Sequence, residues 1–451
     1  MLKRFFLIFA LMILSTSVLG VEADYVSAVL NKIHINKKNV GICVYDLALG
    51  KPIYSFNEGK TFSIASVNKL FITAAAIKFL GQDFRFKTSV YGGVPDSDGV
   101  ISSSLYIKGG GDPIFVSESM WYLVNRLSAL GIKKINSDIY IDDTLFPAAE
   151  IYEETDDRAY SAKISSLSVN FNSIALSVVS GPRPSFIIDP PLGEYSVVDK
   201  AKRSRSQTDI YINRTGSDIS ISGNVDNSNY SNKWIYRNID DPISYFSDVL
   251  KLHLKWRGID FSGKILKGET PKGEKLLFDI ESRRLSEIMM EMNKFSNNFI
   301  AEQTIRALAC KISEKCDVKK AIDAVFKYLG DNGLDTKDFN IVNASGFSRS
   351  NTTTPLGFVK FLGMVYNDFE IAPEFINSLS IAGVDGTIRR SIKEPEFKGK
   401  LRAKTGTLTG VRSLAGYYYK NNHVYAFIIV ANDPNAHKLL DYEGKILQNI
   451  N

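Results

Sequence analysis

Ser66 and Lys69, three residues apart, are the residues whose types and spacing most directly suggest chemistry. They open an apolar stretch that predicts a helix over 66–80, stopped by Gly81. Positions three apart lie on one helix face, so the Lys69 amine can reach the Ser66 hydroxyl and accept its proton. The chemistry would be nucleophilic attack by serine, although an isolated pair of this kind is more often a capping serine beside an exposed lysine.

Two further short segments carry polar groups. Ser-Asn-Asn at 296–298 stands in a break between two expected helices, and alone it is typical of a helix cap and turn. Lys-Thr-Gly-Thr at 404–407 ends an expected strand. Gly406 allows a substrate backbone to approach closely, and a lysine beside a hydroxyl can hold a carboxylate. The alternative for this segment is a strand end followed by a turn.

In sequence order the segments read Ser-x-x-Lys, Ser-x-Asn and Lys-Thr-Gly, the signature of penicillin-binding proteins and serine β-lactamases. The chain resembles one family in particular, the DacB-type class C low-molecular-mass penicillin-binding proteins, which are D-alanyl-D-alanine carboxypeptidases and endopeptidases of the cell wall. These relatives insert two domains between the first two motifs, which accounts for the long separation of Ser66 from Ser296. The resemblance is carried by residues 62–88, 106–113, 343–349, 382–387 and 404–417.

The resemblance implies that Ser66 attacks the carbonyl between the two terminal D-alanines of a peptidoglycan stem peptide, and that water resolves the acyl-enzyme. Lys69 would be the base, which requires its pKa to fall from ~10.4 toward 7 or 8 at a cost of roughly 3 to 5 kcal/mol. Burial and a second cation, Lys404, both act in that direction. Ser296 would relay the proton to the leaving nitrogen, and Asn298 would bind the substrate amide.

By the same resemblance, Lys404 and Thr405, next to Gly406, would bind the terminal carboxylate. The backbone N–H groups of Ser66 and Thr407 would form an oxyanion hole. This mechanism needs no metal or cofactor, and β-lactam antibiotics would be covalent inhibitors. None of the four histidines stands at metal-ligand spacing from another, which argues against a zinc hydrolase.

Relatives also recognise the far end of diaminopimelate in the stem peptide. From the matching segments 141–146 and 345–349, we expect Asp142 to bind the free ammonium, Arg349 to bind the carboxylate, and Phe146 to line the pocket. The alternative is a strand-end aspartate and a surface arginine.

Two other functions stay open. A serine β-lactamase shares the three motifs but often uses a glutamate to activate water, and no convincing Glu-x-x-Leu-Asn element is found. A wall-binding scaffold would keep the fold without turnover, although nucleophile, base and carboxylate-binding residues are all present. Carboxypeptidase and endopeptidase reactions are not distinguished, because both cleave after a D-alanine carbonyl.

The elements that must hold these residues come from both ends of the chain. Strand pairs joined by turns are expected near each end, at 40–47 with 52–56 and at 411–420 with 423–430. A closing helix is expected from Pro434.

The implied fold is α/β (α+β): a transpeptidase-like domain whose antiparallel sheet is flanked by helices, with two inserted, mainly β domains. The expected boundaries are 24–88 and 284–451 for the catalytic domain, 89–169 and 237–283 for domain II, and 170–236 for domain III.

Composition favours an ordinary globular protein, since 44% of residues are hydrophobic and 23% charged. A net charge of +6 gives no sign of a nucleic-acid partner. Residues 1–23 combine Lys3 and Arg4 with an apolar run and then small residues, which predicts a cleaved secretory signal peptide. We expect a periplasmic protein without a stable membrane anchor.

The three cysteines are read in that oxidising context. Cys310 and Cys316 are able to pair only if their helix ends between them, and the sequence leaves this open. Cys43 is expected to be a small buried hydrophobe.

Overall fold

The computed structural model describes residues 25–146, 148–149, 157–193, 195–205 and 207–450, so the expected signal peptide lies outside the described residues. The chain forms two compact units. Of the described residues, the first unit contains 25–82, 285–297 and 319–450, and the second contains those within 83–284 and 298–318.

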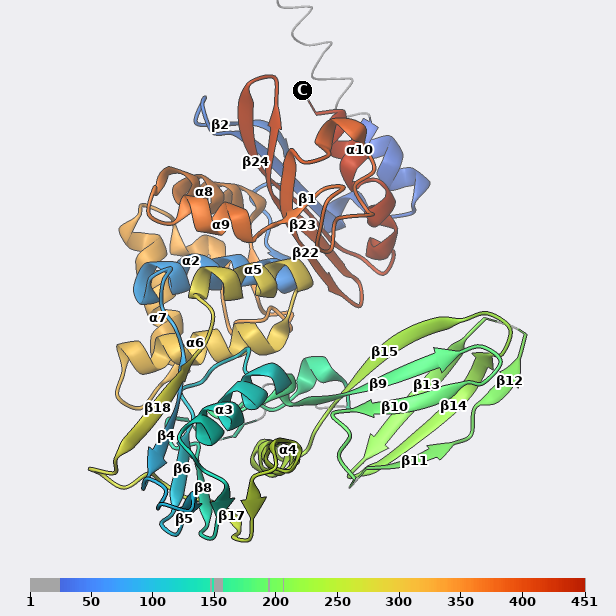
Figure 1. Cartoon of the computed structure of the whole chain (residues 1–451). Coiled ribbons are helices and arrows are strands. Elements are labelled where there is room, and N and C mark those ends of the chain that lie inside the picture. Colours follow the sequence, from blue (N-terminus) through green and yellow to red (C-terminus); the bar gives the residue numbers. More distant parts are fainter. Residues whose placement is uncertain (1–24, 147, 150–156, 194, 206, 451) are drawn as a thin grey trace, which may run out of the picture. The chain divides into compact units, whose positions relative to one another are not determined.

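The first unit is built on a six-stranded antiparallel sheet with the strand order β2-β1-β24-β23-β22-β21 (Figure 1). Apolar runs make these strands, and the inner ones are buried on both faces. Strands from both ends of the chain therefore meet in one sheet, as predicted. Their bounds are β1 Val40–Asp46, β2 Lys51–Phe56, β21 Ser380–Ile381, β22 Leu401–Leu408, β23 Val411–Lys420 and β24 His423–Asn432.

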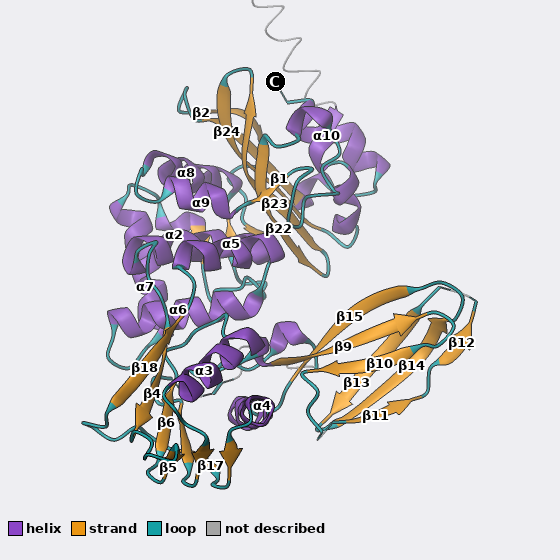
Figure 2. Cartoon of the chain, in the orientation of Figure 1, coloured by secondary structure: helices purple, strands orange, loops and turns teal. Residues whose placement is uncertain are grey.

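Helices cover this sheet on both sides, with α8 and α9 on one side and α10 on the other (Figure 2). The closing helix expected from Pro434 is two pieces, the 3₁₀ turn η7 and α10. The bounds are η2 Ala65–Asn68, α2 Lys69–Leu80, α5 Leu285–Phe295, α7 Val318–Asp331, α8 Pro355–Asn367, α9 Ala372–Ser378, η7 Ala436–Asp441 and α10 Glu443–Gln448.

The second unit contains a five-stranded mixed sheet, β17-β8-β6-β4-β18, and a small sheet, β16-β7-β5. Helices α3 (Ser117–Ala129), α4 (Pro242–Arg257) and α6 (Asn298–Ile312) belong to the same unit. The strands of these sheets are β4 Lys87–Gly92, β5 Val100–Ile101, β6 Leu105–Lys108, β7 Lys134–Ile135, β8 Ile139–Asp142, β16 Asp260–Phe261, β17 Ile265–Lys267 and β18 Leu276–Glu281.

Two further sheets of the second unit lie in the stretch expected to be domain III: β10-β9-β15, and β11-β14-β12 with β13 on β14. One hydrophobic cluster runs from Val90 to Ile280 and includes residues of both expected insertions. The division into domains II and III, like the boundary at 284, stays a prediction. The bounds are β9 Ser173–Ser180, β10 Ser185–Asp189, β11 Ser196–Asp199, β12 Lys202–Ser204, β13 Asp209–Thr215, β14 Asp218–Asp226 and β15 Ser231–Asn238.

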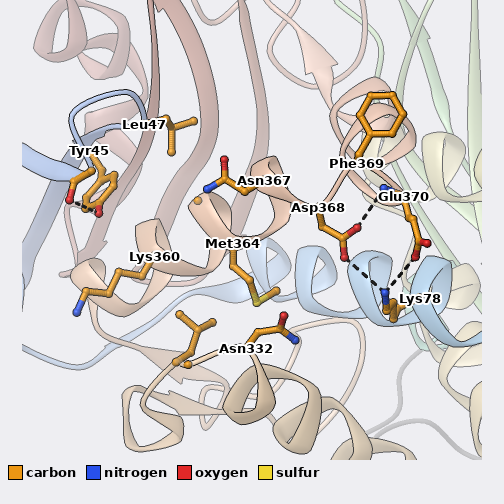
Figure 3. A pocket seen from close by; sticks show the side chains of 14 residues that line it. Tyr45, Leu47, Lys78, Asn332, Lys360, Met364, Asn367, Asp368, Phe369 and Glu370 are labelled. Atoms are coloured by element: carbon orange, nitrogen blue, oxygen red, sulfur yellow. Dashed lines mark hydrogen bonds and ion pairs between the residues drawn. The ribbon is translucent and has the colours of Figure 1, made fainter.

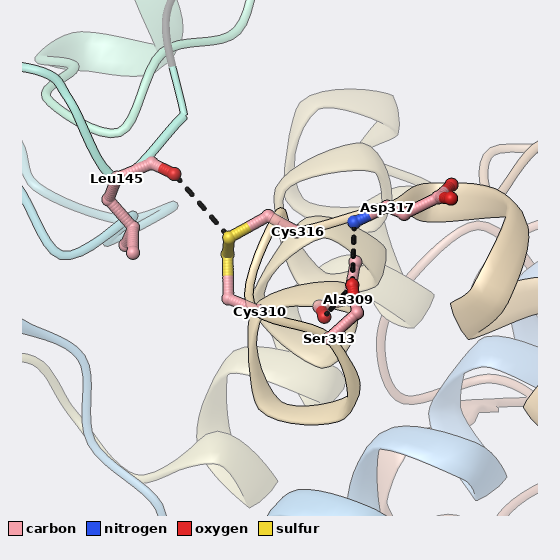
Figure 4. The surroundings of a disulfide bond; sticks show 6 residues. All are labelled: Leu145, Ala309, Cys310, Ser313, Cys316 and Asp317. Carbon is pink, nitrogen blue, oxygen red and sulfur yellow. Dashed lines mark hydrogen bonds between the residues drawn. A yellow bond between two sulfur atoms is a disulfide. The ribbon is translucent and has the colours of Figure 1, made fainter.

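A disulfide joins Cys310 to Cys316 at the end of α6 (Figure 4). The helix ends at Ile312, between the two cysteines, which is the condition that pairing required. The Cys316 Sγ lies 3.4 Å from the carbonyl oxygen of Leu145, on the loop that follows β8. Cys43 is buried and unpaired with another cysteine, as expected.

Candidate active site

Ser66 lies in the 3₁₀ turn η2, and Lys69 is the first residue of α2, so the helix predicted over 66–80 starts with a tighter turn than expected. The Lys69 Nζ donates a hydrogen bond to Ser66 Oγ at 2.9 Å. Lys69 is fully buried, because α2 is enclosed by packing over residues 69–77. The predicted contact between amine and hydroxyl is therefore formed.

Backbone groups of the 343–346 loop hold this pair in place. The Ser345 carbonyl accepts from Lys69 Nζ at 2.6 Å and from Ser66 Oγ at 3.4 Å. Gly346 allows this approach: its φ is +78°, and a Cβ there would stand 2.0 Å from the Ala65 carbonyl oxygen. Only glycine fits that combination of left-handed backbone and contact.

Ser296 and Lys404 form the second hydroxyl–amine pair. Ser296 has a φ of +58° in the turn between α5 and α6, and its Oγ accepts from Lys404 Nζ at 2.7 Å. Lys404 is fully buried and also donates to the Thr405 carbonyl at 2.7 Å. Burial, followed by the positive charges of Lys69 and Arg412, holds the pKa of Lys404 well below its usual value.

The Lys-Thr-Gly-Thr segment lies in β22, beside η2. A Cβ on Gly406 would stand 2.5 Å from the Ile64 carbonyl oxygen, so glycine lets the strand lie directly on η2. The close approach predicted at Gly406 is thus to the chain's own backbone. Thr405 Oγ1 donates to Thr387 Oγ1 at 2.8 Å, and Thr407 is exposed.

The first unit therefore brings together Ser66, Lys69, Ser296 and Lys404, with Thr405 next in the strand. Asn298 begins α6 in the second unit. The Lys69 amine contacts the Ser66 hydroxyl, and the Lys404 amine contacts the Ser296 hydroxyl. Burial and the positive charge of Lys69 both lower the pKa of Lys404. Such a cluster has the groups that can serve as a nucleophile, a base and a proton relay.

Asp142 and Phe146 belong to the second unit, and Arg349 to the first. Asp142 is buried at the end of β8, where it accepts from Thr144 N at 3.0 Å and Thr270 N at 2.8 Å and lies 3.6 Å from Lys108 Nζ. Burial opposes ionisation, but these hydrogen bonds hold the pKa of Asp142 below its usual value.

Phe146 is also buried, whereas Arg349 donates from Nη2 to the Thr409 carbonyl. Sequence reasoning assigned no role to Ser345, Thr387 or Arg412, although all three stand in segments that carry the family resemblance.

Among the described residues, no group of His, Cys, Asp and Glu side chains has the arrangement of a metal site, and no helix is long and apolar enough to cross a membrane. A cavity of about 920 Å³ in the first unit is lined by parts of β1, α2 and α8 and by the loop that follows α7 (Figure 3). It includes the Lys78 amine, which pairs with Glu370 at 3.2 Å, but none of the site residues predicted from the sequence.

The fold and this cluster define the class, which is that of penicillin-binding proteins. The solved structure of penicillin-binding protein 4 from Haemophilus influenzae matches with a TM-score of 0.77 at 21% identity, over 91% of this chain and 96% of that one. Residues 23–447 match the D-Ala-D-Ala carboxypeptidase 3 (S13) family, and the chain belongs to that family as a DacB-type class C enzyme. The family and the fold class expected from the sequence are confirmed.

Two curated relatives are similar over most of their length. A D-alanyl-D-alanine carboxypeptidase from an Actinomadura species is 28% identical over 441 residues, which cover 90% of this chain and 81% of the relative. D-alanyl-D-alanine carboxypeptidase DacB of Haemophilus influenzae is 26% identical over 407 residues, which cover 84% of this chain and 82% of the relative.

Proposed function

We propose that this serine-type D-alanyl-D-alanine carboxypeptidase acts through a covalent intermediate on Ser66. The observation that carries the proposal is the 2.9 Å contact between the Ser66 hydroxyl and the fully buried Lys69 amine. The substrate is the stem peptide of peptidoglycan, consistent with family membership. Cleavage of the bond between two D-alanines releases free D-alanine, and cleavage of a cross-link separates two stems.

In the acylation step, neutral Lys69 takes the proton of Ser66 as its oxygen attacks the D-alanine carbonyl. The backbone N–H groups of Ser66 and Thr407 stabilise the oxyanion. The proton then passes through Ser296 to the leaving nitrogen, and the C–N bond breaks. Water attacks the ester, and Ser66 recovers a proton as the peptide leaves.

Lys404 keeps Ser296 oriented through the 2.7 Å hydrogen bond. With Thr405 it binds the terminal carboxylate, next to Gly406, and Asn298 binds the substrate amide. Two lysines serve these steps better than one, because each cation favours the neutral form of the other.

The test is labelling of the purified mature protein with a fluorescent penicillin, with the adduct followed over hours. Wild-type protein is expected to form a stable adduct, and Ser66→Ala none. Ser63→Ala is a matched control three residues earlier on β3 (Phe62–Ser63), and it should label like wild type. Labelling of Ser66→Ala would refute the assignment of the nucleophile.

The same experiment separates the two alternative functions. Rapid release of hydrolysed drug would favour a serine β-lactamase, since that activity depends on fast deacylation. A folded protein that forms no adduct would favour a wall-binding scaffold. A β-lactam complex of the Haemophilus influenzae penicillin-binding protein 4 has been solved, which supports the choice of probe.

We further propose that the stem peptide carries diaminopimelate, with Asp142 binding its ammonium, Arg349 its carboxylate and Phe146 lining the pocket. The ionised state of Asp142 supports the first contact. Turnover of a diaminopimelate peptide should fall in Asp142→Ala and Arg349→Ala, while turnover of a peptide that lacks the distal groups is retained. Equal losses on both peptides would contradict the assignment.

Export to the periplasm is proposed from residues 1–23, without a stable membrane anchor. Cell fractionation should place the protein in the periplasmic fraction, and the mass of the mature chain should show loss of about 20 residues. A full-length chain in the cytosol would contradict export.

A further inference from the structure

A buried ion pair lies next to the Lys-Thr-Gly-Thr strand, with its arginine on the neighbouring strand β23. Arg412, in β23, donates from Nε and Nη2 to the two carboxylate oxygens of Glu443, both at 2.6 Å. Glu443 is the first residue of α10. The two side chains are 8% and 0% exposed.

Stability alone does not explain such a pair. Removing two charges from water is costly, and well-packed apolar residues in their place are often as stable or more so. The geometry leaves one arm of the guanidinium outside the pair. Arg412 Nη1 donates to Thr407 Oγ1 at 3.2 Å, across the register in which Arg412 faces Thr407.

This contact decides how the Thr407 hydroxyl is used. A guanidinium only donates, so Thr407 Oγ1 must act as acceptor toward Arg412, and its own hydrogen stays available for another acceptor. Thr405 lies two residues earlier on the same strand face. A carboxylate bound at Thr405 is therefore a suitable acceptor for the Thr407 hydroxyl.

We propose that Arg412 and Glu443 are positioning residues that fix the Thr407 hydroxyl as a donor to the terminal carboxylate of the stem peptide. Glu443 holds the guanidinium plane in one orientation through two hydrogen bonds, and Arg412 transmits that orientation to Thr407. The inference rests on the proposed function, because it requires a substrate carboxylate beside Thr405.

The test is a double-mutant cycle on a synthetic peptide ending in D-Ala-D-Ala. Thr407→Val and Arg412→Lys should each raise KM about tenfold, the loss of one hydrogen bond to a charged group, with kcat nearly unchanged. The double variant should be no worse than Thr407→Val. Glu443→Gln should raise KM by about threefold, and only in chains that retain Thr407.

Arg412→Lys is the central variant, because a lysine keeps the positive charge beside Lys404 and can still pair with Glu443. It therefore tests the proposal even if the Glu443→Gln protein does not fold. Its pH–rate profile should match wild type. A shifted profile, a loss confined to kcat, or losses that add in the double variant would overturn the proposal.

Asp46→Asn is the matched control. It removes a buried carboxylate that pairs with His423 at 2.7 Å. Asp46 belongs to the same sheet but lies in β1, which pairs with β24 and not with the strand of Thr407. Its KM should equal that of wild type, and an equal rise in KM would reduce the effect to general loosening of the sheet. Failure of the proposed function would be recognised separately, by turnover or labelling that survives Ser66→Ala.

Discussion

Lys404 is a cation in a place that disfavours cations. Its amine is fully buried and feels the charges of Lys69 and Arg412, and it has hydrogen bonds to Ser296 and to the Thr405 carbonyl. The pKa of Lys404 falls below the value of 10.5 that holds for the unfolded chain. The site therefore carries an electrostatic cost in the folded state.

This cost should make the free energy of unfolding depend on pH in a direction that can be measured. Because the unfolded chain binds a proton at Lys404 that the folded protein binds less well, the contribution of this residue to stability rises with pH up to about 10.5. Lys404→Met should abolish turnover. Relative to wild type, its free energy of unfolding should be most favourable at low pH, and that advantage should shrink toward pH 10. Chemical denaturation between pH 6 and 10 measures this, and a constant difference would contradict it.

At the scale of single elements, the close contact of β22 with η2 determines where the Lys-Thr-Gly-Thr side chains lie. Gly406 is the residue that permits this contact, since the Ile64 carbonyl oxygen occupies the space of a side chain. The same closeness places Lys404 over the turn between α5 and α6, where Ser296 is held in a left-handed conformation.

Gly406→Ala should therefore push β22 away from η2. We expect a loss of about 1–3 kcal/mol in unfolding free energy from overpacking, and a reduced rate of acylation by penicillin. Gly59→Ala is the control, because nothing lies within 4 Å of the added methyl there. Thermal melts and acylation kinetics of the two variants give the comparison, and an equal tolerance of both would contradict the tight contact.

A second element-scale prediction concerns the disulfide. The double variant Cys310→Ser/Cys316→Ser should lower the unfolding free energy of the second unit by about 2 kcal/mol. Without the disulfide, the unfolded chain gains the conformational entropy that closing a short loop had removed. The contact of Cys316 with the Leu145 carbonyl places the bond next to the loop that carries Phe146. Melting of the double variant beside oxidised wild type measures the loss, and identical melting would refute it.

The parts of the site that follow from local pattern could be predicted from the sequence. Ser66 and Lys69 are three residues apart, and nearly continuous apolar runs mark β1 and β24. The Ser345 carbonyl could not be found this way, because every residue has one and only the fold selects it. The contact of Arg412 with Glu443 was hidden for a related reason, as the two residues belong to different elements.

At the scale of the whole molecule, each unit contains a hydrophobic cluster of its own. One cluster gathers residues of the first unit, such as Ile42, Leu414 and Phe427, and another gathers those of the second, such as Val90 and Ile174. Ser66 belongs to the first unit and the disulfide to the second.

Perturbations of the two units should therefore be separable. Acylation of Ser66 by penicillin should raise the melting temperature of the transition that reports on the first unit, since a ligand bound only to the folded state stabilises it. Reduction of the disulfide should lower the other transition. Differential scanning calorimetry with each treatment alone tests this, and a single transition that moves with both would contradict it.

The pairing of β1 with β24 also sets the order of events in synthesis. Val40 lies opposite Ala431, so β1 leaves the ribosome long before β24 exists, and until then the edge of β1 that pairs with β24 is unpaired. Long-range pairings of this kind form slowly. β22, with Lys404, is also among the last segments made, so the Ser66 hydroxyl meets its complete surroundings only when the chain is nearly finished. Because of this topology, Ser66 lacks part of its surroundings until β22 has been synthesised. No inhibitory segment is needed for that delay.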